Sequence, residues 1–218
     1  MFHVINDPNR TQAGRMATSY ADWLMMALRA QTLTTRALVA SNPMDIDILV
    51  SYLPLAEARA ACPPGVHLLL PLQEDGSRQR NKLGPICLPF GSRDSGKRAA
   101  IVAFALAKQL EIEIVATHTT YRKDGVKGDD PQLHLIEAAH KRSLELIAQA
   151  RANDVVLRFN FQLADEVPNC VMDAAIENDC SLIVMARGDV LFGSNAERVA
   201  QCTHIPILIV ADERKGNS

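Results

Sequence analysis

Residues 86–117 read ICLPFGSRDSGKRAAIVAFALAKQLEIEIVAT, and this stretch decides the fold class. A short apolar run, Ile86–Phe90, leads through a Gly-Ser turn into Ser95–Leu110, whose apolar residues recur at helical spacing. A second apolar run, Glu113–Thr117, follows directly. A strand, a helix and a strand joined in this way are typical of a βαβ unit with two parallel strands.

The same alternation continues along the whole chain. Eight apolar runs have the length of a strand: Phe2–Ile5, Ile46–Val50, Val66–Leu72, Ile86–Phe90, Glu113–Thr117, Val155–Phe161, Ser181–Met185 and Ile205–Val210. Five segments predict helices: Thr11–Ala30, Ser95–Leu110, His134–Ala152, Val167–Asn178 and Ala196–Cys202. Because strands that are apolar on both faces are buried on both faces, we expect a three-layer α/β/α fold around a mainly parallel, Rossmann-like sheet.

A polar segment divides the chain into two unequal parts. Residues 73–83 predict a linker between an N-terminal part, residues 1–72, and a larger domain, residues 84–212. Residues 213–218 predict a polar tail.

The N-terminal part is interpreted as a partial copy of the larger domain, in a tandem arrangement. Asp47–Pro71 can be laid over Ser181–Val210, since each contains a strand, a turn, a short helix with Ala-Glu, a cysteine and a final strand. Likewise, Phe2–Pro8 and the helix after it are similar to Ala116–Thr120 and the helix after that strand. On this alignment the first copy lacks its opening strand, helix and strand, either through degeneration or because the chain is a piece of a longer protein.

Composition and charge exclude several classes of partner. The chain has 23 Lys and Arg against 25 Asp and Glu, a formal net charge of −2, so no nucleic-acid partner is expected. No apolar run approaches the roughly 18 residues of a membrane span, and the N-terminus lacks the pattern of a signal peptide. These features predict a cytoplasmic location.

The cysteines and histidines indicate neither a disulfide framework nor a metal site. Five cysteines are present, an odd number without a C-x-x-C pair, and they are interpreted as reduced and mostly buried thiols. The six histidines show neither H-x-x-x-H nor H-E-x-x-H spacing. No metal ligand is predicted.

Three stretches of the larger domain resemble the universal stress protein family. Ile86–Ala100, followed by Phe104–Ala107, is similar to the family's first strand, Gly-Ser turn and first helix. Ser181–Gly188 resembles its fourth strand, and Phe192–Val210 resembles its closing helix and strand. The resemblance implies an adenine nucleotide alpha hydrolase-like fold whose last strand pairs with its twin across a dimer.

The resemblance also implies a nucleotide site, which is altered in this chain. Many family members bind ATP with a Gly-x2-Gly-x9-Gly-Ser/Thr loop and an Asp after the first strand. Here only four residues separate Gly188 from Gly193, and Phe90 stands at the position of the Asp. We therefore expect no tight ATP binding. If an adenine nucleotide (ATP or AMP) does bind, the residues expected to hold it are Ser92, Arg187, Gly188, Gly193, Ser194 and Asn195. In the alternative interpretation, Gly188 and Gly193 only form a turn, and Ser194 caps the next helix.

A second nucleotide motif is present but incomplete. Residues 91–97, GSRDSGK, match the phosphate-binding G-x-x-x-x-G-K pattern between a strand and a helix. Arg98 replaces the Ser or Thr that would bind Mg²⁺. No catalytic residue is therefore predicted, and a P-loop-like nucleotide-dependent switch remains an alternative.

These observations predict a universal-stress-protein-like regulatory or dimerisation domain with a degenerate nucleotide pocket. The cytosolic domain of a membrane transporter of the cation/proton antiporter type is one expected setting, and an ATP/AMP-binding stress-response protein is the alternative. Because an apolar edge strand invites pairing, we expect Leu68–Leu72 and Ile207–Val210 to pair with each other or across a two-fold axis. A homodimer through Ile207–Val210 is the predicted assembly.

Overall fold

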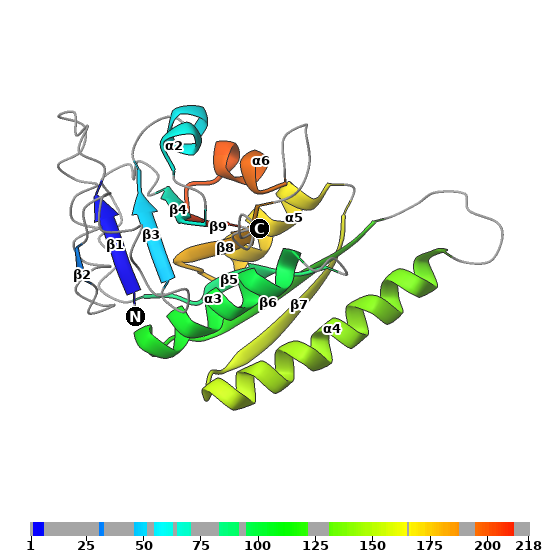
Figure 1. The fold of residues 1–218 in the computed structure, drawn as a ribbon. Coiled ribbons are helices and arrows are strands. Elements are labelled where there is room, and N and C mark those ends of the chain that lie inside the picture. The colour runs from blue at the N-terminus through cyan, green and yellow to red at the C-terminus, as the bar shows by residue number, and fades with distance from the viewer. Residues whose placement is uncertain are drawn as a thin grey trace, which may run out of the picture.

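The computed structural model describes residues 2–6, 31–32, 46–51, 55–62, 65–70, 83–91, 95–121, 131–164, 166–187 and 195–211. These residues form one nine-stranded sheet with the order β2-β1-β3-β4-β9-β8-β5-β6-β7 (Figure 1). The strands are β1 (Phe2–Asn6), β2 (Gln31–Thr32), β3 (Ile46–Val50), β4 (His67–Leu70), β5 (Ile86–Pro89), β6 (Ile114–Tyr121), β7 (Leu157–Ala164), β8 (Leu182–Ala186) and β9 (Ile207–Val210). The helices are α2 (Leu55–Ala61), α3 (Ser95–Leu110), α4 (Pro131–Asn153), α5 (Val167–Glu177) and α6 (Asn195–Cys202).

Helices cover both faces of the sheet, which confirms the three-layer α/β/α prediction. Alternate residues of β8 contribute to two separate hydrophobic cores, one on each face of the sheet. Leu182 and Val184 pack in the core with α3 and α4, and Ile183 and Met185 pack in the core with α2, α5 and α6. Because successive side chains of a strand point to opposite faces, a strand without a polar face requires this double cover. Among the described residues, no helix is both long and apolar enough to cross a membrane.

The two parts of the chain meet at the one antiparallel pair of the described sheet. Leu68, Leu69 and Leu70 of β4 lie opposite Ile209, Leu208 and Ile207 of β9. The expectation that these two apolar segments pair with each other is confirmed. Both edges of β9 are thus occupied within one chain, by β8 and β4. A homodimer through Ile207–Val210 stays a prediction, and it would have to displace β4.

The order of strands corrects the alignment of the two copies. Outward from the central pair, the first copy runs β4, β3, β1, β2 and the second runs β9, β8, β5, β6, β7. β1 is parallel to β3 as β5 is parallel to β8, so β1 occupies the place of the opening strand β5 and not of β6. The prediction that the first copy lacks its opening strand is therefore wrong. What the first copy lacks, in the part of the chain described here, is a counterpart of β7.

Other sequence predictions concern residues outside the described part of the chain, and the cysteines. The predicted helix Thr11–Ala30 and most of the predicted linker lie outside the described residues. All five cysteines are free thiols, as expected. Cys87, Cys170 and Cys180 are buried and Cys62 is half-buried, whereas Cys202, the last residue of α6, is exposed and departs from the predicted burial of the thiols.

Candidate functional site

The candidate site lies where the strand order reverses between β5 and β8. The helix after β5, α3, covers one face of the sheet, and the helix after β8, α6, covers the other. Because the two connections leave in opposite directions, the carboxyl ends of β5 and β8 are not covered by either helix. Open parallel sheets bind ligands at such a switch point.

The sheet separates at this point. β5 and β8 are in register only at Ile86–Leu182 and Cys87–Ile183. Beyond that, the amide of Phe90 donates to the Thr117 carbonyl on β6 at 2.9 Å, and the amide of Arg187 donates to the Val210 carbonyl on β9 at 2.9 Å. The carboxyl half of β5 is therefore hydrogen-bonded to β6 and that of β8 to β9, and the two halves are not hydrogen-bonded to each other. This leaves a gap between the carboxyl ends of β5 and β8.

Gly91 and Arg187 flank this gap. Among the residues that the structure describes, a Cβ added to Gly91 would meet no atom within 4 Å, so these residues leave room for a ligand to approach its backbone. Arg187 is half-buried and directly follows β8. An open backbone and a guanidinium are groups that favour a phosphate. The Arg187 side chain, however, lies beside Cys62 and Glu197.

The other side of the gap is filled by an aromatic cluster, defined as Phe90, His118, Phe159 and Phe161. The Phe90 ring is 8% exposed and lies 5.2 Å from the His118 ring, 5.8 Å from Phe159 and 6.2 Å from Phe161, centroid to centroid. The Phe90 carbonyl is also 3.0 Å from His118 Nδ1. The position where the family carries an Asp is thus a packed apolar ring, and it offers no carboxylate to the base and ribose of a nucleotide.

The structure describes two of the six predicted nucleotide-binding residues. Asn195 is exposed at the first position of α6, and Arg187 follows β8. The other four lie outside the described residues: Ser92, Gly188, Gly193 and Ser194. Their predicted role, and the capping role of Ser194, stay predictions.

Arg187 also lines a small cavity between the two copies. This cavity has room for a single water molecule, ≈ 20 Å³, and is closed by Cys62 and Val66 from the first copy and by Ile209 from the second. Burial raises the pKa of the Cys62 thiol to about 11, against the opposing effect of the Arg187 charge. The thiol is therefore protonated at neutral pH, and the cavity is a packing gap between the copies.

The incomplete P-loop motif lies next to Arg142, a residue that the sequence analysis did not identify. Arg142 on α4 is buried, and its guanidinium lies against the first turn of α3, 3.7 Å from where a Cβ on Gly96 would be. Its Nη1 pairs with Glu145 at 2.5 Å, and this hydrogen bond, with the Arg142 charge, holds the pKa of Glu145 below its usual value. Helical spacing could have predicted that Arg142 is buried, because it lies on the same apolar helix face as Ala139, Leu146 and Ala150. Lys97 is exposed on α3.

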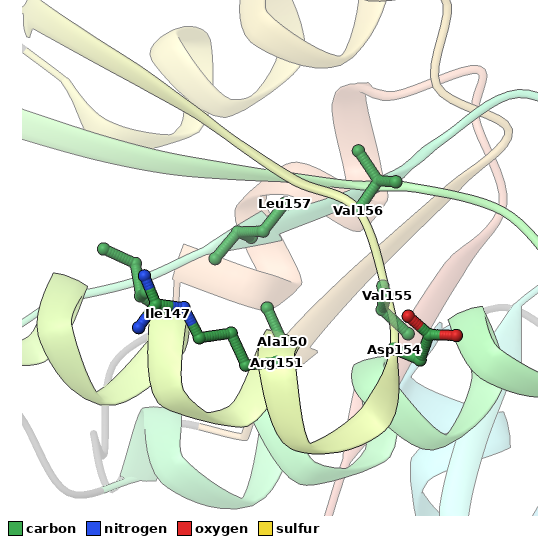
Figure 2. Close-up of a pocket in the computed structure, with 7 residues that line it drawn as sticks. All are labelled: Ile147, Ala150, Arg151, Asp154, Val155, Val156 and Leu157. Atoms are coloured by element: carbon green, nitrogen blue, oxygen red, sulfur yellow. The ribbon is translucent and has the colours of Figure 1, made fainter.

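A larger cavity, ≈ 320 Å³, lies near the amino end of β7, and the candidate site is at the carboxyl ends of the strands. Figure 2 shows its lining residues: Ile147, Ala150, Arg151, Asp154, Val155, Val156 and Leu157. They come from the last turns of α4 and the beginning of β7, at the amino end of that strand. Since ligands of such sheets bind at the carboxyl ends, this cavity is not the candidate site. In the described part of the chain no group of three His, Cys, Asp or Glu side chains could hold a metal ion.

The sheet order β9-β8-β5-β6-β7, with a switch point between β8 and β5, defines a Rossmann-like α/β domain, here joined to the N-terminal part of the chain through its last strand. The family model of the universal stress proteins matches residues 82–211. The chain belongs to the universal stress protein family, as its sequence resemblance indicated. No curated protein sequence matches this chain.

Solved structures of universal stress proteins share the fold. One from Archaeoglobus fulgidus DSM 4304 is 13% identical, with a TM-score of 0.58 over 95% of this chain and 85% of that one, so the likeness in fold extends over both parts of the chain. One from Burkholderia pseudomallei is 21% identical, with a TM-score of 0.48 over 59% and 96% of the two chains. An Archaeoglobus fulgidus protein, solved in complex with dAMP, is 19% identical, with a TM-score of 0.48 over 58% and 97%.

Proposed function

We propose that this protein is a regulatory or dimerisation module of the universal stress protein family whose nucleotide pocket is degenerate. The observation that carries the proposal is the aromatic cluster. Phe90 occupies the place of the family's Asp, and its ring is buried against three other rings, so the base end of the pocket has apolar packing in place of a hydrogen-bonding carboxylate. Displacing these rings to admit a nucleotide would expose apolar surface to water.

Calorimetric titration with ATP and with AMP, each with and without Mg²⁺, tests the proposal. We expect no binding in the micromolar range for the natural chain. Phe90→Asp supplies the carboxylate and is expected to raise affinity for an adenine nucleotide by at least about tenfold, since a hydrogen bond to a charged group contributes about 1.5–3 kcal/mol.

Phe90→Leu is the matched control, because it removes the ring without adding a carboxylate. It is expected to leave binding at the level of the natural chain, and thermal unfolding checks that both variants are folded. Micromolar binding of ATP or AMP by the natural chain would contradict the proposal.

The second candidate function is an adenine-nucleotide-dependent switch. It is favoured by the separation of β5 from β8, with Gly91 following one strand and Arg187 the other. This arrangement suits a phosphate better than a base. The same titration decides between the candidates: Arg187→Gln would weaken nucleotide binding only if the switch exists.

The setting as a cytosolic domain of a membrane transporter stays a prediction. Its sequence support was the supposed loss of the opening strand in the first copy, and β1 occupies that place. The genomic sequence around the coding region tests it: an adjoining membrane segment would support this setting.

A further inference from the structure

We propose that the outer edge of β7 is a pairing surface for β7 of a second copy of this chain, with the two strands antiparallel about a two-fold axis at Asn160. β7 is the last strand of the described sheet and pairs with β6 on one side only (Figure 1). The result would be one continuous sheet through two chains.

The two ends of the sheet differ in how they are protected. β2, at the other end, has two residues, and so short an edge offers little to pair with. β7 has eight, read LRFNFQLA, with no Pro, no Gly and Arg158 as its one charge. Its register with β6 is continuous from Leu157 to Ala164, without a bulge. Of the usual devices that block an edge strand, the described residues of β7 carry one, the charge of Arg158, and this charge is paired with Glu113 of its own chain.

The direction of the peptide groups limits how two copies can pair. The Val156 carbonyl accepts from the Ile114 amide on β6 at 2.9 Å. Because peptide groups alternate along a strand, the even-numbered residues of β7 are bonded to β6, and the odd-numbered ones direct their N–H and C=O to the free edge. An antiparallel two-fold pair must place odd residues opposite odd residues. Axes at Asn160 and at Phe161 both satisfy this requirement, and each overlaps seven residues of the strand. The axis at Asn160 is the one that places Phe159 of each copy opposite Phe161 of the other.

This register joins side chains that suit each other. Phe161 is 62% exposed although it stacks on Phe159 of its own chain at 5.8 Å. In the pair, each of these rings gains an aromatic partner across the axis, twice by symmetry. On the opposite face of the sheet, Arg158 of one copy lies opposite Gln162 of the other, whose Nε2 is 3.4 Å from the Glu177 carboxylate.

The charges along β7 also favour a second copy of this chain as the partner. Arg158 of each copy comes near Glu177 of the other, and no two charges of the same sign meet on the described side chains of β7. Arg158 keeps its own partner, Glu113, through two hydrogen bonds of 2.6 and 3.1 Å. A second copy would therefore bury the exposed Phe161 ring and leave no charged side chain of β7 without an opposite charge.

Cross-linking and sedimentation test the proposal on the full chain, in a Cys202→Ser background that removes the exposed native thiol. At a non-hydrogen-bonded antiparallel pair the two Cα atoms are about 4.5 Å apart, which is within disulfide range. Asn160→Cys is therefore expected to form a dimer-linking disulfide on mild oxidation. Arg158→Cys is the matched control and should not link to itself, because four residues of offset separate the two copies of position 158 by about 13 Å.

Sedimentation provides the second measurement. The background chain is expected to be a dimer, and Phe161→Lys should raise its dissociation constant by about tenfold or more, since two aromatic pairs are lost and two like charges are placed at one edge. Phe161 is already exposed, so the variant should fold, and circular dichroism checks this. A monomeric background chain, a dimer unaffected by Phe161→Lys, or equal cross-linking at positions 158 and 160 would each overturn the proposal.

Discussion

Replacing Gly84 by alanine is expected to destabilise the fold by about 3 kcal/mol. Gly84 lies just before β5, against the turn that ends α5. A Cβ at this position would lie 2.0 Å from the Asp179 carbonyl oxygen and 3.2 Å from its carbon. Both are backbone atoms, so no side-chain rotation relieves the overlap.

The magnitude follows from what holds the two segments together. The Ser181 amide donates to the Pro85 carbonyl at 3.0 Å, and the Ser181 hydroxyl donates to the Gly84 carbonyl at 2.8 Å. A shift large enough to admit the methyl group would lengthen both bonds, at about 1 kcal/mol each. The backbone displacement at Asp179, whose φ is 52°, adds about 1 kcal/mol of strain.

Urea unfolding measures this change in the free energy of unfolding, and two other glycines serve as controls. The methyl group of Gly91→Ala meets no atom of the described residues within 4 Å, and the variant should stay within about 0.5 kcal/mol of the natural chain. Gly96→Ala, in the first turn of α3, makes an ordinary contact at 3.7 Å with Arg142 and should stabilise by about 0.5 kcal/mol through helix propensity. If Gly84→Ala were as stable as Gly91→Ala, the reasoning from close contact would be refuted.

Two further predictions concern ionisable groups. Glu145→Gln is expected to lower the urea midpoint at pH 7, because it removes a carboxylate that pairs with the buried Arg142. The Glu145 pKa is lowered in the folded state, so its contribution to stability is present above the usual value of 4.5 and is lost as pH falls through the lower, folded pKa. The difference between variant and natural chain should therefore shrink between pH 7 and pH 3, and a difference that does not depend on pH would contradict this. For the thiols, brief iodoacetamide treatment at pH 7.5 followed by peptide mass spectrometry should label Cys202 first, since Cys87, Cys170 and Cys180 are buried and burial raises the Cys62 pKa to about 11. Early labelling of Cys87 would show that the core between β5 and α5 opens readily.

Much of the fold follows from local patterns in the sequence. Each of the eight apolar runs that predicted a strand contains or overlaps one of β1 and β3–β9, and the spacing within Ser95–Leu110 predicted α3 with its bounds. The short β2 was missed, because two residues carry no periodicity. The pairing of β4 with β9 was one of two outcomes that the apolar segments Leu68–Leu72 and Ile207–Val210 predicted, the other being pairing across a two-fold axis. The antiparallel direction was not predicted and comes from the structure.

The place of β1 could not be predicted in the same way. The sequence around Phe2–Asn6 indicates a strand, but a strand's pattern does not specify its neighbours. Only the hydrogen-bond ladder to β3 shows that β1 takes the position of an opening strand. Sequence comparison placed it one strand too far out, because short α/β segments resemble each other whatever their position in a sheet.

At the candidate site, the sequence by itself determined which residues stand at the carboxyl end of β5, namely Phe90 and Gly91 in place of an acidic residue. It also determined the shortened glycine segment after Arg187. Only the tertiary structure decided what surrounds Phe90. His118 and Phe161 are far from it in sequence, and they contact its ring because β5, β6 and β7 are parallel neighbours. Their register places Pro89 opposite Thr117 and His118 opposite Phe161. A side chain's identity is a local fact, whereas its environment depends on which strands pair, and that pairing is fixed by the whole sheet.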